Sequence, residues 1–185
     1  MEHLKFVADI YKAETEEKGS KFISFLIPFD KFENQLKYLK NEHPKAVHFV
    51  YAYRFLNEFR QIVENSSDDG EPKGTSGKPC LKVLEGNNII NSAVIVVRYF
   101  GGTKLGTGGL VRAYSDSVNK VLENAKFEQF EFLQTLILEI NYNELSKLEY
   151  KLKLLDIKII SKNFDEKVII KIEASEEKLK KLMCE

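Results

Sequence analysis

The sequence predicts an α+β protein. Several segments alternate apolar and polar side chains or are rich in β-branched and aromatic residues, which is typical of strands. Between them lie segments with apolar residues three and four positions apart, which predict amphipathic helices. The last third of the chain carries these signals in the order βαββα. With 185 residues, 43% of them hydrophobic, the chain can fill one large core or one ordinary and one small core.

The chain opens with a predicted β-hairpin. Residues 5–15 alternate and predict a strand, residues 18–20 (Lys-Gly-Ser) a turn, and residues 21–29 a second strand. Asp30 is a good N-cap and predicts the start of a helix, which Pro44 would end.

The middle of the chain contains a polar loop between predicted strands. Residues 47–56 are β-branched and aromatic and predict a strand, and residues 66–79 contain no large apolar side chain and predict a long loop. A short helix over 79–85 follows, with Pro79 at its first position. Residues 93–100 form an almost continuous apolar run, which predicts a central strand, and a further helix is expected from Leu110.

The helix expected from Leu110 has two distinct sides. The positions on its apolar side are Leu110, Val111, Tyr114, Val118, Val121 and Leu122. Those on its polar side are Arg112, Asp116, Asn119 and Glu123. This spacing predicts that one side packs on a sheet and the other faces solvent.

The last part of the chain has a different rhythm. Residues 135–143 predict a strand, 144–155 a helix, 157–164 and 167–174 two more strands, and a last helix begins at Ser175. This order matches a ferredoxin-like domain without its final strand. We therefore expect two domains, residues 1–126 and 132–185.

Bulk composition excludes several classes of protein. Lys+Arg and Asp+Glu number 28 each, so a nucleic-acid role requires a local basic patch rather than a basic domain. The two cysteines, Cys80 and Cys184, do not form a disulfide framework or a CxxC site, and Cys80 falls in an apolar helical pattern, so no bond between them is expected. No signal peptide or stretch of ~18 apolar residues is found, which predicts a cytoplasmic protein without membrane contact.

Residues 97–114 (VRYFGGTKLGTGGLVRAY) place five glycines within nine residues. The glycines are Gly101, Gly102, Gly106, Gly108 and Gly109, and the cations Arg98, Lys104 and Arg112 flank them. A helix N-terminus exposes unpaired amides with partial positive charge, and glycine lets a ligand approach the backbone, so the segment predicts an anion site. The alternative is that the glycines only allow a tight turn and close packing.

Two well-known phosphate-binding loops are excluded. The P-loop pattern requires GxxxxGK followed by Ser or Thr, and here Thr107 follows Gly101–Gly106 in place of the lysine. The GxGxxG dinucleotide pattern requires a third glycine where Val111 stands.

The polar loop carries three carboxylates, Asp68, Asp69 and Glu71, within four residues. Carboxylates at this spacing suit Mg²⁺ or acid–base chemistry, but Asp, Gly, Pro and Ser also form solvated turns. The EF-hand pattern is absent, and we expect no metal or other cofactor. His48, at the start of a strand, is a candidate base or phosphate contact, or simply a structural residue.

The two motifs DDGEPKGTSGKP (68–79) and VIVVRYFGGTKLGTGGLVRAY (94–114) resemble the signature of the YigZ/IMPACT family. Residues 46–54 (AVHFVYAYR) resemble the strand that precedes them, and the resemblance extends over roughly 6–125. It implies an N-terminal two-layer α+β domain like domain 2 of a ribosomal small-subunit protein and domain IV of elongation factor G. It also implies a ferredoxin-like second domain similar to that factor's domain V, which in the family normally closes with a fourth strand.

The resemblance also implies a connection with translation. Eukaryotic members of the family restrain activation of a starvation-sensing translation-factor kinase by competing for its activator protein, through a chain with an extra domain. The two domains of bacterial members imply contact with RNA or the ribosome.

The leading hypothesis is therefore a non-enzymatic module of the translation or RNA machinery, monomeric or homodimeric, that contacts phosphates. The phosphate-binding residues would be Arg98, Gly101, Gly102, Lys104, Gly106, Gly108, Gly109 and Arg112. The supporting loop, which would accept hydrogen bonds from these cations or from backbone amides, comprises Asp68, Asp69, Glu71, Thr75 and Ser76.

Two alternatives remain open. The first is an enzyme acting on a phosphorylated small molecule or peptide, with Asp69 or Glu71 as base, His48 assisting and Arg98 stabilising charge. The second is a regulator that binds a translation-associated protein without nucleic acid.

Overall fold

The structure is a computed structural model that describes residues 4–183. The chain divides into two compact units, Met1–Phe130 and Glu131–Glu185. Each unit has its own hydrophobic core. The α+β class predicted from the sequence is confirmed.

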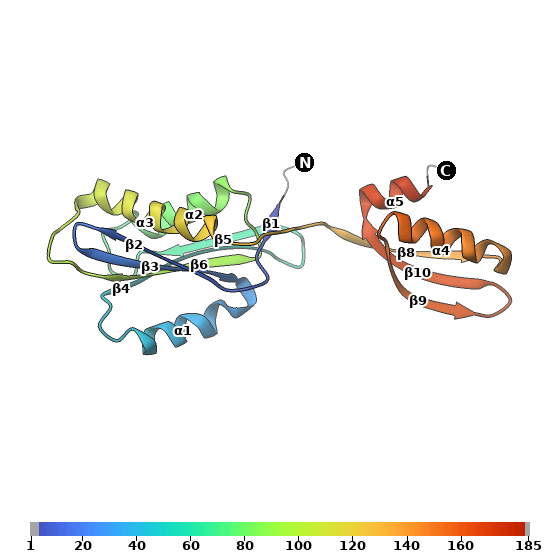
Figure 1. Ribbon diagram of the computed structural model, residues 1–185, viewed down its shortest axis with the longest axis horizontal. Helices are drawn as coiled ribbons and strands as arrows, with labels where there is room; N and C mark the ends of the chain where they lie inside the picture. Colours follow the sequence, from blue (N-terminus) through green and yellow to red (C-terminus); the bar gives the residue numbers. More distant parts are fainter. Residues whose placement is uncertain (1–3, 184–185) are drawn as a thin grey trace. The chain divides into compact units, whose positions relative to one another are not determined.

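Unit 1 is built on a five-stranded antiparallel sheet (Figure 1). In spatial order the strands are β2 (Tyr11–Glu17), β3 (Ser20–Pro28), β6 (Ser92–Tyr99), β4 (His48–Leu56) and β5 (Ile62–Ser67). The apolar run of β6 lies at the centre, buried from Ser92 to Arg98 and paired on both sides. The opening hairpin corresponds to β2 and β3.

Helices cover both faces of this sheet (Figure 1). Helices α2 (Gly77–Gly86) and α3 (Gly106–Glu123) pack on one face, against side chains such as Phe22 of β3. The 3₁₀ turn η1 (Phe29–Lys31) leads into α1 (Phe32–Glu42), which packs on the other face against the alternate residues of β3. Unit 1 thus has three layers rather than the two expected, because side chains of β3, β4 and β6 are apolar on both faces.

Several boundaries differ from the sequence prediction. The strand expected over 5–15 is broken into β1 (Lys5–Phe6) and β2, and β1 pairs with β7 (Glu128–Gln129). The first unit therefore includes residues beyond 126. Asp30 does not cap α1, since it lies within η1 and Lys31 precedes the helix without a side-chain cap.

Two further differences bear on the candidate site. Strand β5 was not predicted, and it takes Ser66 and Ser67 out of the expected polar loop. Helix α2 begins at Gly77 rather than Pro79, and α3 begins at Gly106, four residues before Leu110. Most of the expected inward face of α3 is buried, but Val111 is 39% exposed.

Unit 2 has the predicted βαββα order. It comprises β8 (Leu133–Ile140), η2 (Tyr142–Glu144), α4 (Leu145–Leu154), β9 (Lys158–Phe164), β10 (Val168–Ser175) and α5 (Glu176–Met183). The three strands form an antiparallel sheet in the order β8-β10-β9, with β10 between the two strands that α4 connects. This is the arrangement of the split βαβ unit of ferredoxin-like domains. Cys184 lies outside the described residues, and Cys80 is a buried free thiol.

Candidate functional site

The glycine-rich segment connects β6 to α3 and includes the first turn of that helix. Residues 101–104 are exposed, Leu105 is buried, and Gly106–Gly109 are already helical. Leu105 precedes the helix and offers no side-chain cap. The first amides of α3 therefore have no side chain to accept their hydrogen bonds.

The structure requires glycine at some of the five positions and not at others. Gly101 lies against Gly19 of the β2–β3 turn so closely that a Cβ on Gly101 would stand 1.9 Å from the Gly19 carbonyl carbon. Gly102 and Gly106 have φ of +86° and +72°, a conformation that favours glycine. A Cβ on Gly108, in contrast, would meet nothing within 4 Å, and its φ is not left-handed.

The three flanking cations separate into two groups. Lys104 and Arg112 are exposed, and neither side chain forms a hydrogen bond or ion pair with another residue in 4–183. Arg98 is only 4% exposed, and its Nη1 donates to Oε1 of Glu71 at 2.5 Å. This position does not favour the hypothesis that Arg98 contacts a phosphate, because the side chain lies inside unit 1, paired with a carboxylate.

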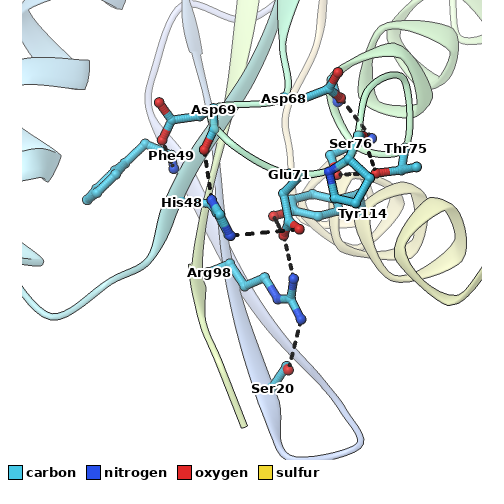
Figure 2. Close-up of polar contacts among 12 residues, drawn as sticks. Ser20, His48, Phe49, Asp68, Asp69, Glu71, Thr75, Ser76, Arg98 and Tyr114 are labelled. Atoms are coloured by element: carbon cyan, nitrogen blue, oxygen red, sulfur yellow. Dashed lines mark hydrogen bonds and ion pairs between the residues drawn. The ribbon is translucent and has the colours of Figure 1, made fainter. Parts of the chain in front are cut away.

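Glu71 is the centre of a buried polar cluster (Figure 2). Besides Arg98, Tyr114 of α3 donates to Glu71 Oε1 at 2.8 Å, and Nε2 of His48 lies 3.7 Å from Oε2. Burial, together with the neighbouring Glu71 charge, raises the pKa of Tyr114 well above its ordinary value, so its phenol keeps its proton and donates. Nδ1 of His48 contacts the Asp69 carbonyl at 2.7 Å, so this nitrogen is the donor.

The other two carboxylates of the loop accept hydrogen bonds from backbone amides (Figure 2). Asp68 accepts hydrogen bonds from the amides of Gly74, Ser76 and Gly77, at the start of α2. Asp69 accepts from the amide of Phe49 at 2.6 Å.

Residues 69 and 70 make a tight turn. Both have positive φ, and the amide of Glu71 donates to the Asp68 carbonyl. Left-handed φ at both central positions is the requirement of a type I′ turn, for which Asp-Gly is a preferred pair. Thr75 and Ser76 are buried within the same loop, where the Thr75 hydroxyl donates to the Pro72 carbonyl.

The arrangement does not favour the metal or catalytic hypotheses. Asp68, Asp69 and Glu71 face three different sets of donors, and within residues 4–183 no three His, Cys, Asp or Glu side chains are grouped to hold a metal ion. Glu71 is enclosed by Arg98 and Tyr114 and is 9% exposed, so a substrate has no direct approach to its carboxylate.

The buried cluster nevertheless reaches the glycine-rich segment. Nη2 of Arg98 donates to the hydroxyl of Ser20 at 3.3 Å, and that hydroxyl accepts from the amide of Gly101 at 3.2 Å. We call Glu71, Arg98, Ser20 and Gly101 the inner frame. It joins the polar loop, the β2–β3 turn and the glycine-rich segment.

Sequence reasoning missed two members of this cluster. Ser20 follows a turn glycine like many other serines and carries no local signal. The helical spacing places Tyr114 on the apolar side of the helix. The only signal of a polar role is its hydroxyl, which needs a hydrogen-bond partner when buried.

Comparisons with known proteins agree along most of the chain. The model of the family described as Impact N-terminal domain matches residues 18–122. An IMPACT family member from Haemophilus influenzae is 34% identical over 176 residues, which cover 93% of this chain and 85% of that protein. The IMPACT family member YigZ from Escherichia coli is 36% identical over 162 residues, covering 85% and 78%.

A solved crystal structure, described as a hypothetical protein, shares the fold. It is 32% identical, has a TM-score of 0.65, and the match covers 98% of this chain and 90% of that one. In the part of the chain that the structure describes, no helix has the length and apolar character that crossing a membrane requires.

Proposed function

Because the chain belongs to the IMPACT family, we propose that it is a non-enzymatic binding module of the translation machinery that holds RNA phosphates at the first turn of α3. The link with translation is the one that the family resemblance implies. The phosphate site would comprise the amides of Gly106–Gly109 and the side chains of Lys104 and Arg112.

The observation that carries this proposal is the open backbone at Gly108. Glycine in a helix costs up to about 1 kcal/mol relative to alanine. At Gly108 neither the φ angle nor a neighbouring atom requires glycine, since a Cβ there would meet nothing within 4 Å. A glycine without a structural reason, next to uncapped helix amides, is expected where a ligand approaches the backbone.

The charges around this turn support an anionic ligand. Lys104 lies two residues before the start of α3, and Arg112 lies in the second turn of the helix. Both are exposed and without partners among residues 4–183. The positive end of the helix dipole also favours a negative group here. Contacts of this kind recognise phosphates and not bases, so binding with little sequence preference is expected.

The inner frame gives Arg98 and Glu71 a supporting role in this proposal. Arg98 fixes Ser20, and Ser20 fixes the amide of Gly101, at the start of the glycine-rich segment. Glu71 holds Arg98 in place, so Glu71 and Arg98 are positioning residues for the phosphate site and do not contact the ligand.

The experiment is binding to single-stranded RNA and to ribosomes over a series of salt concentrations. The logarithm of the affinity should fall linearly with the logarithm of the salt concentration, and Arg112→Ala or Lys104→Ala should each reduce the slope by about 0.7. Lys37→Ala, which removes an exposed cation from α1 on the opposite face of the sheet, is the matched control and should leave the slope unchanged. Absence of RNA binding, or ribosome binding that survives nuclease treatment and ignores salt, overturns the proposal.

A further inference from the structure

A depression of about 360 Å³ lies beside the proposed phosphate site. One wall comes from the end of β2 and the turn that follows it, and the other from the first turns of α3. Five charged residues line it, and four of them have side chains without a partner: Glu17, Lys18, Arg112 and Asp116. The fifth, Glu16, lies directly across the hairpin from Lys21 and interacts with its charge. Arg112 thus belongs both to this depression and to the proposed phosphate site.

None of these four side chains forms a hydrogen bond or ion pair with another residue in the range 4–183. Surface charges elsewhere in unit 1 do find partners, as Glu14 does with Lys12 and Lys21. The depression therefore holds unpaired charges of both signs within the reach of one small ligand.

These side chains have definite chemical requirements. An ionised carboxylate only accepts hydrogen bonds, whereas arginine and lysine only donate. A group that satisfies both must carry an anion for Arg112 and Lys18 and hydrogen-bond donors for Glu17 and Asp116. A ribonucleotide has this combination, because its 2′-hydroxyl lies next to the phosphate and carboxylates are known acceptors for ribose hydroxyls.

We propose that the carboxylates of this depression distinguish RNA from DNA by accepting a hydrogen bond from the 2′-hydroxyl. The inference rests on the proposed function and adds to it which sugar, ribose or deoxyribose, the site recognises. It also explains why acidic residues lie beside a phosphate site. Their charges weaken the binding of any phosphate, and a hydrogen bond from a 2′-hydroxyl compensates for this loss of affinity. DNA has no 2′-hydroxyl, so the repulsion is not compensated.

The experiment compares three single-stranded oligonucleotides of one sequence: RNA, DNA and 2′-O-methyl RNA. The full chain should bind RNA about tenfold more tightly than the other two, which lack the hydroxyl donor. Glu17→Ala and Asp116→Ala, singly and combined, should lower affinity for RNA while raising affinity for DNA. Opposite shifts on the two nucleic acids cannot result from a change in net charge alone.

Glu42→Ala is the matched control, because it removes one exposed carboxylate from α1 on the opposite face of the sheet. It should shift RNA and DNA affinities together or leave both unchanged. Equal binding of RNA and DNA by the unmodified chain, or parallel shifts in the Glu17 and Asp116 variants, overturns this inference but does not contradict the phosphate site. Failure to bind any of the oligonucleotides overturns the proposed function instead.

Discussion

At the scale of single residues, Glu71 and Arg98 are the most constrained pair in unit 1. Their side chains are 4% and 5% exposed, and Arg98 also stacks its guanidinium over the Phe22 ring, 5.4 Å from its centre. Burying a charge without a partner costs several kcal/mol, so each of the two charges compensates for the burial of the other.

We expect Glu71→Gln and Arg98→Met each to reduce the free energy of unfolding by about 3–5 kcal/mol, because each leaves a buried charge without its partner. The double variant should lose much less than the sum. Urea denaturation of the two single variants and the double variant measures this coupling. The same cycle on the exposed pair Lys120–Glu123 should give a coupling below about 1 kcal/mol. Additive losses at Glu71 and Arg98 would mean that the pair contributes nothing as a unit.

Asp68 makes the polar loop sensitive to acid. Burial raises the pKa of its carboxyl, but the amides of Gly74, Gly77 and Ser76 together outweigh burial and hold it below the ordinary value. A carboxyl with a depressed folded pKa stabilises the fold above its unfolded pKa of about 4, and this contribution is lost as the pH falls through the folded value.

Asp68→Asn should therefore reduce the free energy of unfolding by about 1–2 kcal/mol at pH 7, in the range of a lost helix cap. The difference between the variant and the unmodified protein should shrink as the pH falls below about 4. Thermal or urea unfolding from pH 7 to pH 2.5 measures it. A difference that stays constant over this range would show that the charge of Asp68 is not what stabilises the loop.

The residues of the site were only partly predictable. The loop carboxylates were expected to accept hydrogen bonds from cations or amides, and Asp68, Asp69 and Glu71 do so. Burial of the Glu71–Arg98 pair could not be predicted, because these residues are 27 positions apart and meet only when the loop folds over β6. Local sequence shows which groups need partners, but not which partners the fold supplies.

At the scale of elements, the strongest patterns were the most reliable. The apolar run of β6 and the periodic apolar residues of α3 predicted a central strand and a helix packed on it. Strand β5 was missed because it is an edge strand of mostly polar side chains, held by pairing with β4. The start of α3 was missed because glycines are poor helix formers, so Gly106–Gly109 gave no helix signal.

Substitutions of these glycines can distinguish an effect on stability from an effect on binding. Gly108→Ala should raise the free energy of unfolding by up to about 1 kcal/mol, because alanine favours the helix and its Cβ meets no neighbour. It should nevertheless weaken RNA binding, since the methyl group stands where the ligand approaches. Unfolding and binding are measured on the same preparation.

Gly86→Ala is the matched control, because its Cβ also meets nothing within 4 Å and it lies at the far end of α2. It should not affect RNA binding. Gly101→Ala marks the opposite extreme and should strongly destabilise unit 1 through its contact with Gly19. If Gly108→Ala bound RNA as well as the unmodified chain does, the ligand would have to lie elsewhere.

At the scale of the whole molecule, the neutral charge of the chain matters most. With 28 basic and 28 acidic residues, no overall field draws nucleic acid toward the protein, and association depends on local groups. Unit 1 contains the glycine-rich segment, the inner frame and the depression beside α3. Unit 2 folds around a core of its own.

The contact between Gly19 and Gly101 has a practical consequence for labelling the protein. Hairpin tips are usual places to insert a peptide tag or fluorescent reporter. The tip between β2 and β3 is unsuitable, since its backbone lies directly against Gly101 and any added residue would push the two segments apart. The tip between β4 and β5, where Phe59 is 73% exposed, is the better place for a reporter that leaves the glycine-rich segment intact.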